Sequence, residues 1–336
     1  MRMELLILGG TRFIGRYVTE RALENGHTVT LFNRGTNKQQ FSDVETIIGD
    51  RDGDLSSLAG REWDAVIDTS GFIPRTVNKS TKLLQDRVNH YTYISSVSAY
   101  QDFGEKPCTE SSPLQEISDT EAERITAGTA GPIYNEHYGA LKAKCEAVAE
   151  KNLNGRVLHI RPGLVVGPYD YSDRFTYWVK RIHEGGEVLA PGNPERPVQF
   201  IDVRDLADWV LRMTEQRTAG AYNVTGREKM STMGEVLASC KKASGSNAVF
   251  RWVNEEFLLE NEIAPWTELP LWLPESMSAA ETNVDRALRE GLSLRPLEET
   301  IHDVLNWLPI RNDETPLKAG LTREKEKALL RMAESR

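Results

Sequence analysis

A tyrosine and a lysine four residues apart are the residues of this sequence best suited to acid–base chemistry. Tyr138 and Lys142 stand in the segment YGALK, within a stretch whose pattern predicts a helix. Residues four apart lie on one face of a helix, so the two side chains would be neighbours. A nearby ammonium favours the phenolate and lowers a tyrosine pKa from its usual value of about 10. Tyr138 is therefore a candidate general base or acid, whereas Tyr134 has no lysine four residues on.

Two serines end a strand-like run upstream of this pair. The run 90–100, HYTYISSVSAY, predicts a buried strand, with Ser95 and Ser96 toward its carboxyl end. At that end of a sheet strand, a serine hydroxyl can hold a substrate oxygen beside the tyrosine. A Tyr/Lys pair alone is common by chance, and the serines are what make it a candidate catalytic site.

A glycine turn lies between a predicted first strand, 4–8, and a predicted first helix that Asn25-Gly26 ends. Gly9 and Gly10 permit the tight turn, and Gly15 would let the helix pack close to the strand. Backbone N–H groups and the positive end of the helix then face a phosphate. The strand–turn–helix context favours a dinucleotide site over a purely structural turn.

Two arginines predict which dinucleotide is bound. The second predicted strand, 27–35, ends at Asn33-Arg34 without the carboxylate that would bind a free ribose 2′-hydroxyl. Arg12 projects from the glycine turn toward the same region, and two guanidiniums suit a dianionic phosphate. NADP is therefore the expected cofactor and NAD is possible; the alternative is that one or both arginines are solvated charges. Asp50, after the third strand, is expected to bind the adenine amine.

The full candidate cofactor set follows the carboxyl ends of successive strands, and Lys142 would also hold the nicotinamide ribose. The set comprises Gly9, Gly10, Thr11, Arg12, Phe13, Ile14, Gly15, Asn33, Arg34, Asp50, Arg51, Thr69, Ser70, Gly71, Ser95, Tyr138, Lys142 and Pro162.

Strands alternating with helices must position these residues. Further strands are predicted at 44–50, 63–71 and 155–167, with a helix near 75–87. This order predicts an α/β protein with a Rossmann-type doubly wound parallel sheet. After about residue 165 the alternation weakens, which predicts a smaller α/β C-terminal substrate domain.

The expected domain boundaries follow from this change. They are 1–165 with parts of 198–225 for the NADP-binding domain, 166–197 and 226–310 for the substrate domain, and 311–336 for a charged C-terminal helix.

Composition excludes several classes of protein. The 336 residues carry a net charge of −9, which makes nucleic acid an unlikely partner. Three widely spaced cysteines do not indicate a disulfide framework, and the six histidines lack metal-site spacing, so no metal is expected. No apolar run approaches the length of a membrane span, so we expect no membrane association and a cytoplasmic location.

Six segments resemble the extended branch of the short-chain dehydrogenase/reductase superfamily, often called NAD-dependent epimerase/dehydratases. They are GGTRFIG, YISSVSAY, YGALK, RPGLVVGP, VQFIDVRDLADWV and NVDRALREGLSLRPLEETIHDVLNWL, which occur in the family's order over most of the chain. GGTRFIG and NRG also resemble a subgroup that includes chloroplast stem-loop RNA-binding proteins.

The resemblance implies Ser96, Tyr138 and Lys142 as the catalytic set, hydride exchange at a carbon bearing a hydroxyl, and a possible homodimer. The expected protein is an NAD(P)-dependent oxidoreductase or epimerase acting on a small molecule, a nucleotide sugar or similar hydroxylated metabolite. The alternatives are a non-catalytic nucleotide- or RNA-binding protein of the same fold and a metabolite-sensing regulator. Val97 stands where a dehydratase would carry an acidic residue, which disfavours a dehydratase.

Further expectations concern four arginines and one long segment. Arg174 and Arg196 are tentative ligands of a substrate phosphate, whereas Arg161 and Arg204 are expected to pair with Asp202 or Asp205. The long segment 101–135, between the serines and Tyr138, is expected to be either a lid or a disordered loop.

Overall fold

The computed structural model describes residues 2–37, 40–103, 105–129, 131–226, 231–277, 281–311 and 315–335. They form two compact units. Unit 1 comprises 1–163, 203–225 and 282–293, and unit 2 comprises 164–202, 226–281 and 294–336.

Unit 1 is built on a seven-stranded sheet in which all neighbouring strands are parallel. The residues of Glu4–Leu8, Trp63–Asp68 and Val157–Pro162 are mostly buried, as expected of strands covered on both faces. This sheet confirms the predicted doubly wound fold. In order across the sheet, the strands are β11 (Gly220–Val224), β6 (Val157–Pro162), β5 (Val88–Ile94), β4 (Trp63–Asp68), β1 (Glu4–Leu8), β2 (Thr28–Asn33) and β3 (Glu45–Ile48).

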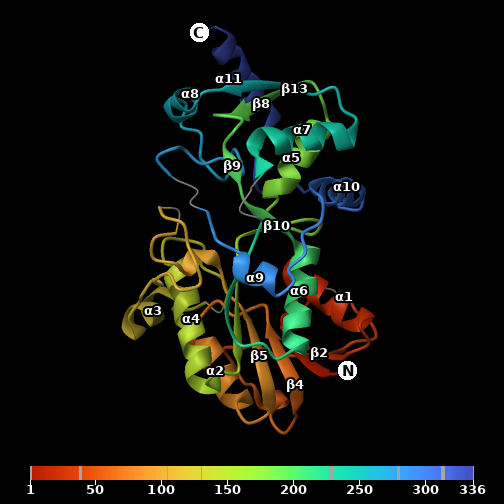
Figure 1. Ribbon diagram of the computed structural model, residues 1–336, viewed down its shortest axis with the longest axis vertical. Helices are drawn as coiled ribbons and strands as arrows, with labels where there is room; N and C mark the ends of the chain where they lie inside the picture. The colour runs from red at the N-terminus through yellow and green to blue at the C-terminus, as the bar shows by residue number, and fades with distance from the viewer. Residues whose placement is uncertain are drawn as a thin grey trace. The chain divides into compact units, whose positions relative to one another are not determined.

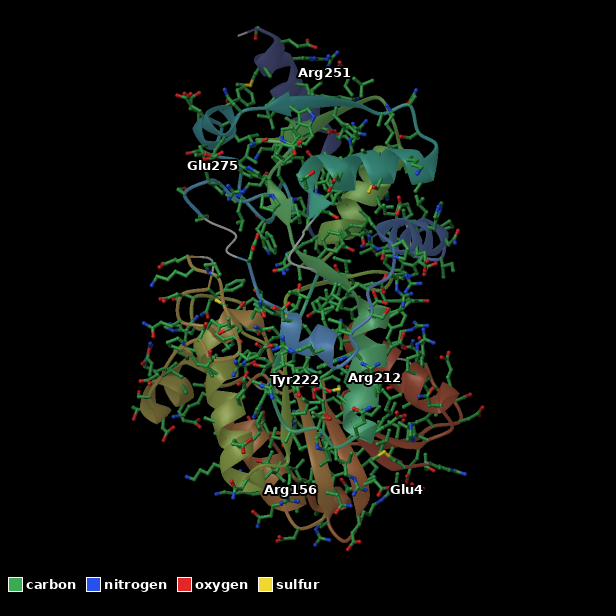
Figure 2. The ribbon with its side chains drawn as sticks, viewed as in Figure 1. Glu4, Arg156, Arg212, Tyr222, Arg251 and Glu275 are labelled. Atoms are coloured by element: carbon green, nitrogen blue, oxygen red, sulfur yellow. The ribbon has the colours of Figure 1, made fainter. Side chains whose placement is uncertain are left out.

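Helices cover both faces of this sheet (Figure 1). On one face α1 (Phe13–Glu24) packs with α6 (Val203–Glu215), and on the other α2 (Pro74–Leu84) packs with α4 (Tyr138–Leu153). Figure 2 shows Glu4 and Arg156 at the amino edge of the strands. The candidate catalytic residues belong to the opposite, carboxyl edge.

The strand order reverses between β1 and β4, and the loops after these two strands lie side by side. In open α/β sheets a ligand binds at such a switch point. The glycine turn follows β1 and the segment Thr69–Gly71 follows β4, so both predicted cofactor segments lie at this point.

Unit 2 is a smaller α/β unit with its own apolar core. Its helices are α5 (Arg174–His183), α7 (Met233–Ser244), α8 (Glu255–Glu260), α10 (Leu297–Trp307) and α11 (Arg323–Glu334). Its strands pair two by two: β7 (Leu164–Val166) with β10 (Phe200–Asp202), β8 (Glu187–Pro191) with β13 (Val249–Val253), and β9 (Pro197–Val198) with β12 (Ser231–Thr232). The sequence analysis did not predict β8 or β13.

The division into units differs from the predicted boundaries at three places, the last of which is the C-terminal helix. The 155–167 strand is two strands, β6 and β7, which belong to different sheets because the units divide after Gly163. Residues 282–293, with α9 (Asp285–Arg289), belong to unit 1 because Arg286 stacks on Tyr222, labelled in Figure 2, and donates to the Ala221 carbonyl.

The C-terminal helix α11 is part of unit 2 rather than a separate element. Leu329 and Leu330 are buried in the unit 2 core. Glu326 is also buried, accepting from the Arg181 guanidinium at 2.7 Å and from the Leu189 amide at 3.1 Å. This charged helix therefore has an apolar stripe that packs into the unit 2 core.

The segment 101–135 contains a short helix, α3 (Asp119–Ile125), and forms hydrogen bonds with β11 and α2 of unit 1. Near its start, Glu110 accepts a hydrogen bond from the Asn223 amide at 3.1 Å. Farther along, the Arg75 guanidinium of α2 donates to the carbonyls of Thr126 and Thr129. This is not the arrangement of a disordered loop.

Across the described ranges, each helix is too short or too polar to cross a membrane.

Candidate active site

The Lys142 ammonium is buried at the carboxyl edge of the unit 1 sheet, with only 2% of the residue exposed. Nζ donates to the Gly71 carbonyl after β4 at 2.8 Å and to the Ile94 carbonyl at the end of β5 at 2.5 Å. Burial lowers the pKa of Lys142 to about 8. The lysine is thereby fixed between two adjacent strand ends and titrates close to neutral pH.

A close backbone contact sets Tyr138 beside the serine-containing turn. Tyr138 is half-buried and is the first residue of α4. At the next position, a Cβ on Gly139 would lie only 1.9 Å from the Ser98 carbonyl oxygen, so only glycine fits. The start of α4 therefore lies directly against the turn that follows Ser96.

Ser96 lies after the end of β5 and is the N-cap residue of a short 3₁₀ helix, Val97–Ala99. Its hydroxyl accepts a hydrogen bond from the Ser98 amide at 3.1 Å, which fixes the Oγ position. Ser95 is buried beside it, and its amide donates to the Ile160 carbonyl at 2.6 Å. The structure thus brings the carboxyl end of β5 and the first turn of α4 together, as the catalytic hypothesis requires.

The glycine turn has the backbone conformation that the sequence predicted. Gly9 and Gly10 have φ angles of 105° and 84°, which favour glycine. A Cβ on Gly15 would lie 2.8 Å from the Gly10 amide nitrogen, so α1 passes very close to the turn. Phe13, the first residue of α1, is buried with a φ of 36°, a sparsely populated conformation for a non-glycine residue.

Thr69 locks the glycine turn to the end of β4. Its Oγ1 donates to the Leu8 carbonyl at 3.0 Å and accepts from the Gly10 amide at 3.4 Å. Ser70 is held next to it, since its amide donates to Asp68 at 3.1 Å. The two loops at the switch point are therefore one hydrogen-bonded structure.

The residues expected near the adenosine lie around the end of β2. The Asn33 side chain donates to the Gly9 carbonyl at 3.4 Å and accepts from the Gly35 amide at 2.8 Å. Arg12 and Arg34 are exposed, and the four residues directly after β2, 34–37, include no carboxylate. Asp50 is exposed and accepts a hydrogen bond from the Asp52 amide at 2.9 Å.

Three more residues of the candidate set lie in the glycine turn, in the first turn of α1 and at the end of β6. Thr11 accepts from the Asn37 side-chain amide at 3.1 Å, Ile14 is half-buried in the first turn of α1, and Pro162 ends β6 opposite Val224.

Arg51 points into the protein instead of toward a ligand. It is buried and binds the Asp68 carboxylate through two hydrogen bonds of 2.6 Å. The same guanidinium donates to Ser80 Oγ at 2.8 Å, and the Tyr91 hydroxyl donates to Asp68 at 2.7 Å. Because these hydrogen bonds occupy the guanidinium, Arg51 supports the Thr69–Gly71 segment through Asp68. It is therefore not a proposed cofactor contact.

Arg161 also has a different partner from the one predicted. It forms a buried pair with Glu146 of α4, with guanidinium–carboxylate distances of 3.0 and 2.6 Å, and not with Asp202 or Asp205. Glu146 stands 15 residues before Arg161 on another element, so sequence spacing does not indicate this pair. Glu146 lies four residues after Lys142, so the pair joins the catalytic helix to β6.

Arg174 begins α5 in unit 2 and lies over an aromatic ring. Its guanidinium carbon is 5.3 Å from the centre of the Trp266 ring. Trp266 has a φ of 65°, so this stretch of unit 2 adopts a strained backbone. The stacked, half-buried guanidinium keeps Arg174 a candidate ligand for a substrate phosphate.

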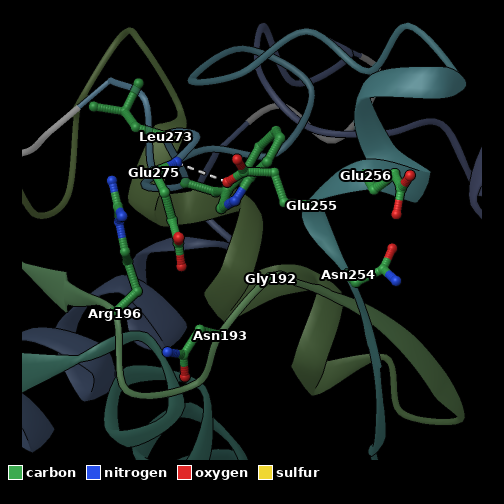
Figure 3. A pocket seen from close by; sticks show the side chains of 9 residues that line it. Gly192, Asn193, Arg196, Asn254, Glu255, Glu256, Leu273 and Glu275 are labelled. Carbon is green, nitrogen blue, oxygen red and sulfur yellow. Dashed lines mark hydrogen bonds between the residues drawn. The ribbon is translucent and has the colours of Figure 1, made fainter.

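Arg196 lines a pocket of unit 2 with a volume of about 390 Å³ (Figure 3). Its guanidinium donates to the carbonyls of Pro274 and Met277 at 2.9 and 3.1 Å. Three carboxylates line the same pocket, which disfavours an anion there. The pocket is lined by Gly192, Asn193, Arg196, Asn254, Glu255, Glu256, Trp272, Leu273 and Glu275.

The described residues contain no group of three or more His, Cys, Asp or Glu side chains arranged to hold a metal ion. Cys108, Cys145 and Cys240 are all buried free thiols.

Comparison with known proteins identifies the family. The model of the NAD dependent epimerase/dehydratase family matches residues 5–225, from the first strand through β11. The chain belongs to the NAD dependent epimerase/dehydratase family. The match spans the glycine turn, the serine strand and the Tyr/Lys helix.

One relative in this family is the chloroplast stem-loop binding protein of 41 kDa b from Arabidopsis thaliana. It is 28% identical over 261 residues, which cover 72% of this chain and 63% of the relative. The alignment therefore spans less than two thirds of that protein's length.

Solved epimerase structures share the fold. The UDP-glucuronic acid 4-epimerase of Bacillus cereus in complex with NAD superposes with a TM-score of 0.67 at 15% identity, covering 94% of this chain and 100% of that one. The UDP-N-acetylglucosamine 4-epimerase of Methanobrevibacter ruminantium M1, in complex with UDP-N-acetylmuramic acid, gives 0.67 at 18% identity, covering 92% and 99%.

Proposed function

We propose that this protein is an NAD(P)-dependent oxidoreductase or epimerase that acts on a nucleotide sugar or a similar hydroxylated metabolite. One observation carries the proposal: Gly139 packs the first turn of α4 against Ser98 while Lys142 is bound by the Gly71 and Ile94 carbonyls. These contacts bring Ser96, Tyr138 and Lys142 to one edge of the sheet. The epimerase neighbours and the family support the substrate class.

The residues at the switch point fit a bound dinucleotide. The close approach of Gly15 to Gly10 leaves the backbone of the turn open to a pyrophosphate that side chains would otherwise block. The dinucleotide supplies the hydride acceptor or donor of the reaction. Besides this turn, the proposed cofactor contacts are Asn33, Arg34, Asp50, Thr69, Ser70, Gly71, Ser95, Tyr138, Lys142 and Pro162.

Each member of the catalytic set has a distinct role. Ser96 Oγ, oriented by the Ser98 amide, holds the reacting oxygen of the substrate. Tyr138 Oη accepts or returns the proton of that oxygen. The positive charge of Lys142 favours the phenolate form of Tyr138. Two of the three N–H groups of its ammonium donate to carbonyls, and the third would donate to the nicotinamide ribose.

The test is a panel of UDP-sugars and other hydroxylated metabolites, read by NADPH absorbance and by NMR of the sugar. Tyr138→Phe should remove most of the turnover, and Tyr134→Phe is the matched control. The Tyr134 ring lies 5.2 Å from that of Tyr138, but Tyr134 is 59% exposed and lacks a lysine four residues on. Full turnover in Tyr138→Phe would disprove the acid–base role.

The cofactor is proposed to be NADP, with Arg12 and Arg34 binding the 2′-phosphate. Arg34→Glu should weaken NADP binding by about 10- to 100-fold, since a charge-assisted hydrogen bond is lost and a like charge is added. Arg61→Ala is the control, because Arg61 pairs with Glu45 at the start of β3. Tighter binding of NAD than of NADP by the parent protein in calorimetry would refute this preference.

For the substrate, we keep Arg174 as the proposed phosphate ligand and not Arg196, whose pocket is acidic. The homodimer expected from the family stays a prediction.

A second candidate is a non-catalytic nucleotide- or RNA-binding protein, favoured by the chloroplast stem-loop binding relative. The net charge of −9 opposes it. Filter binding of a structured RNA at physiological salt distinguishes the two: tight, salt-dependent retention without turnover on the panel would favour RNA binding.

A further inference from the structure

The Lys142 ammonium is buried without a carboxylate of its own. The two carboxylates whose charge acts on it are each paired with an arginine at 2.6 Å, Asp68 with Arg51 and Glu146 with Arg161. In the described part of the chain, no carboxylate lies within ion-pair distance of Nζ. Because a buried charge without compensation is strongly unfavourable, other groups must stabilise this one.

Two aromatic rings lie close to the ammonium. Nζ lies 4.5 Å from the centre of the Tyr93 ring and 5.2 Å from the centre of the Phe72 ring. Both distances are within the range of a cation–π interaction, which is strongest where water is excluded. Tyr93 is fully buried on β5, whereas Phe72, directly after Gly71, is half-buried.

Tyr93 also fixes one of the carbonyl acceptors. Its hydroxyl donates to the Gly71 carbonyl at 2.7 Å, and the same oxygen accepts from Lys142. A Cβ on Gly71 would lie 2.6 Å from both the Tyr93 ring and Asp68, so this residue has no room to move.

We propose that Phe72 and Tyr93 are positioning residues that hold the Lys142 ammonium charged and in place through their ring faces. This inference rests on the proposed function only for the role of Lys142 in catalysis. The titratable and charged groups around the ammonium are Arg51, which lies between β3 and β4, Asp68 of β4, Tyr93 of β5, and Cys145 and Glu146 of α4.

The proposal predicts the effect of removing each ring. Without a ring face the ammonium loses a favourable interaction in a dry site, while the burial that disfavours its charge remains. Phe72→Leu and Tyr93→Leu should each lower the pKa of Lys142 from about 8 by about half to one pH unit. Phe72→Tyr and Tyr93→Phe keep the ring and should change it less.

The experiment is an NMR pH titration of the full chain carrying lysine labelled with ¹³C at Cε. The Lys142 resonance is assigned as the one missing from Lys142→Met. Thermal melting confirms that each variant is folded. If Tyr93→Leu does not fold, the titration of Lys142 in Phe72→Leu tests the proposal, because Phe72 is only half-buried.

An unchanged Lys142 titration in folded Phe72→Leu would overturn the proposal, because the ring would then only fill space. A shift in Tyr93→Phe as large as that in Tyr93→Leu would also overturn it for Tyr93. The titration needs neither substrate nor cofactor, so it can fail or succeed independently of the turnover test with Tyr138→Phe.

Discussion

Gly139→Ala tests the backbone contact that places Tyr138. An alanine Cβ would lie 1.9 Å from the Ser98 carbonyl oxygen and 2.6 Å from the Gln115 side-chain nitrogen. Ordinary contacts of this kind begin near 3.4 Å, so α4 and the Ser98 turn must separate by about 1.5 Å. Gln115 can rotate away, but Ser98 O is backbone and must move with its turn.

Two effects oppose each other in this variant. Alanine is the better helix former by about 1 kcal/mol, which would stabilise α4 on its own. Overpacking against a fixed backbone costs about 1–3 kcal/mol. Since the clash is with backbone at both ends, we expect a net loss of about 1–2 kcal/mol in the free energy of unfolding.

The effect on turnover should be larger than the effect on stability. A displacement of about 1 Å from the reactive geometry can cost about 100-fold in rate, and Tyr138 would move with the start of α4. Urea unfolding measures the stability, and turnover of the substrate found in the panel measures the displacement.

Gly53→Ala is the control for these measurements. A Cβ there meets only atoms at 3.5 and 3.6 Å, and the φ angle needs no glycine. If Gly139→Ala unfolds at the same or higher urea concentration than the parent and keeps its full rate, the tight seating of α4 is refuted.

Three further predictions concern the support of the two units. Glu146→Gln leaves Arg161 buried without its carboxylate and should cost about 3–5 kcal/mol in urea unfolding, whereas Glu150→Gln, at a partly exposed carboxylate, should cost under about 1 kcal/mol; equal losses would contradict the role of burial. Burial alone would raise the pKa of Glu146, but the hydrogen bonds and charge of Arg161 hold it below its usual value. Its stabilisation is therefore present above the unfolded-state pKa of about 4.3 and is lost as the pH falls through the lower folded-state value, so Glu146→Gln should show a flatter acid dependence of stability than the parent. In unit 2, Thr232→Ala breaks the capping box with Glu235 that begins α7 and should cost about 1 kcal/mol, measured by urea unfolding; no change would mean that the cap is replaced by water.

The elements of the sheet and most helices were predictable because they depend on local pattern. The apolar run 4–8, the Gly9-Gly10 turn and the 3.6-residue periodicity after it predict strand, turn and helix without reference to the rest of the chain. The spacing of Tyr138 and Lys142 likewise places both on one helix. Strands β8 and β13 were not predicted because each is stabilised by pairing with the other, about sixty residues away.

The sequence by itself determined which residues are candidates for the chemistry and which edge of the sheet they belong to, because both follow from side-chain type and from the alternation of strands and helices. Only the tertiary structure decided the partners of the buried charges. Arg51 with Asp68, Arg161 with Glu146, and Lys142 with two carbonyls and two rings are contacts between segments distant in the chain. No local spacing encodes them, since each buried charge takes whichever compensating group the packed strands and helices bring within reach.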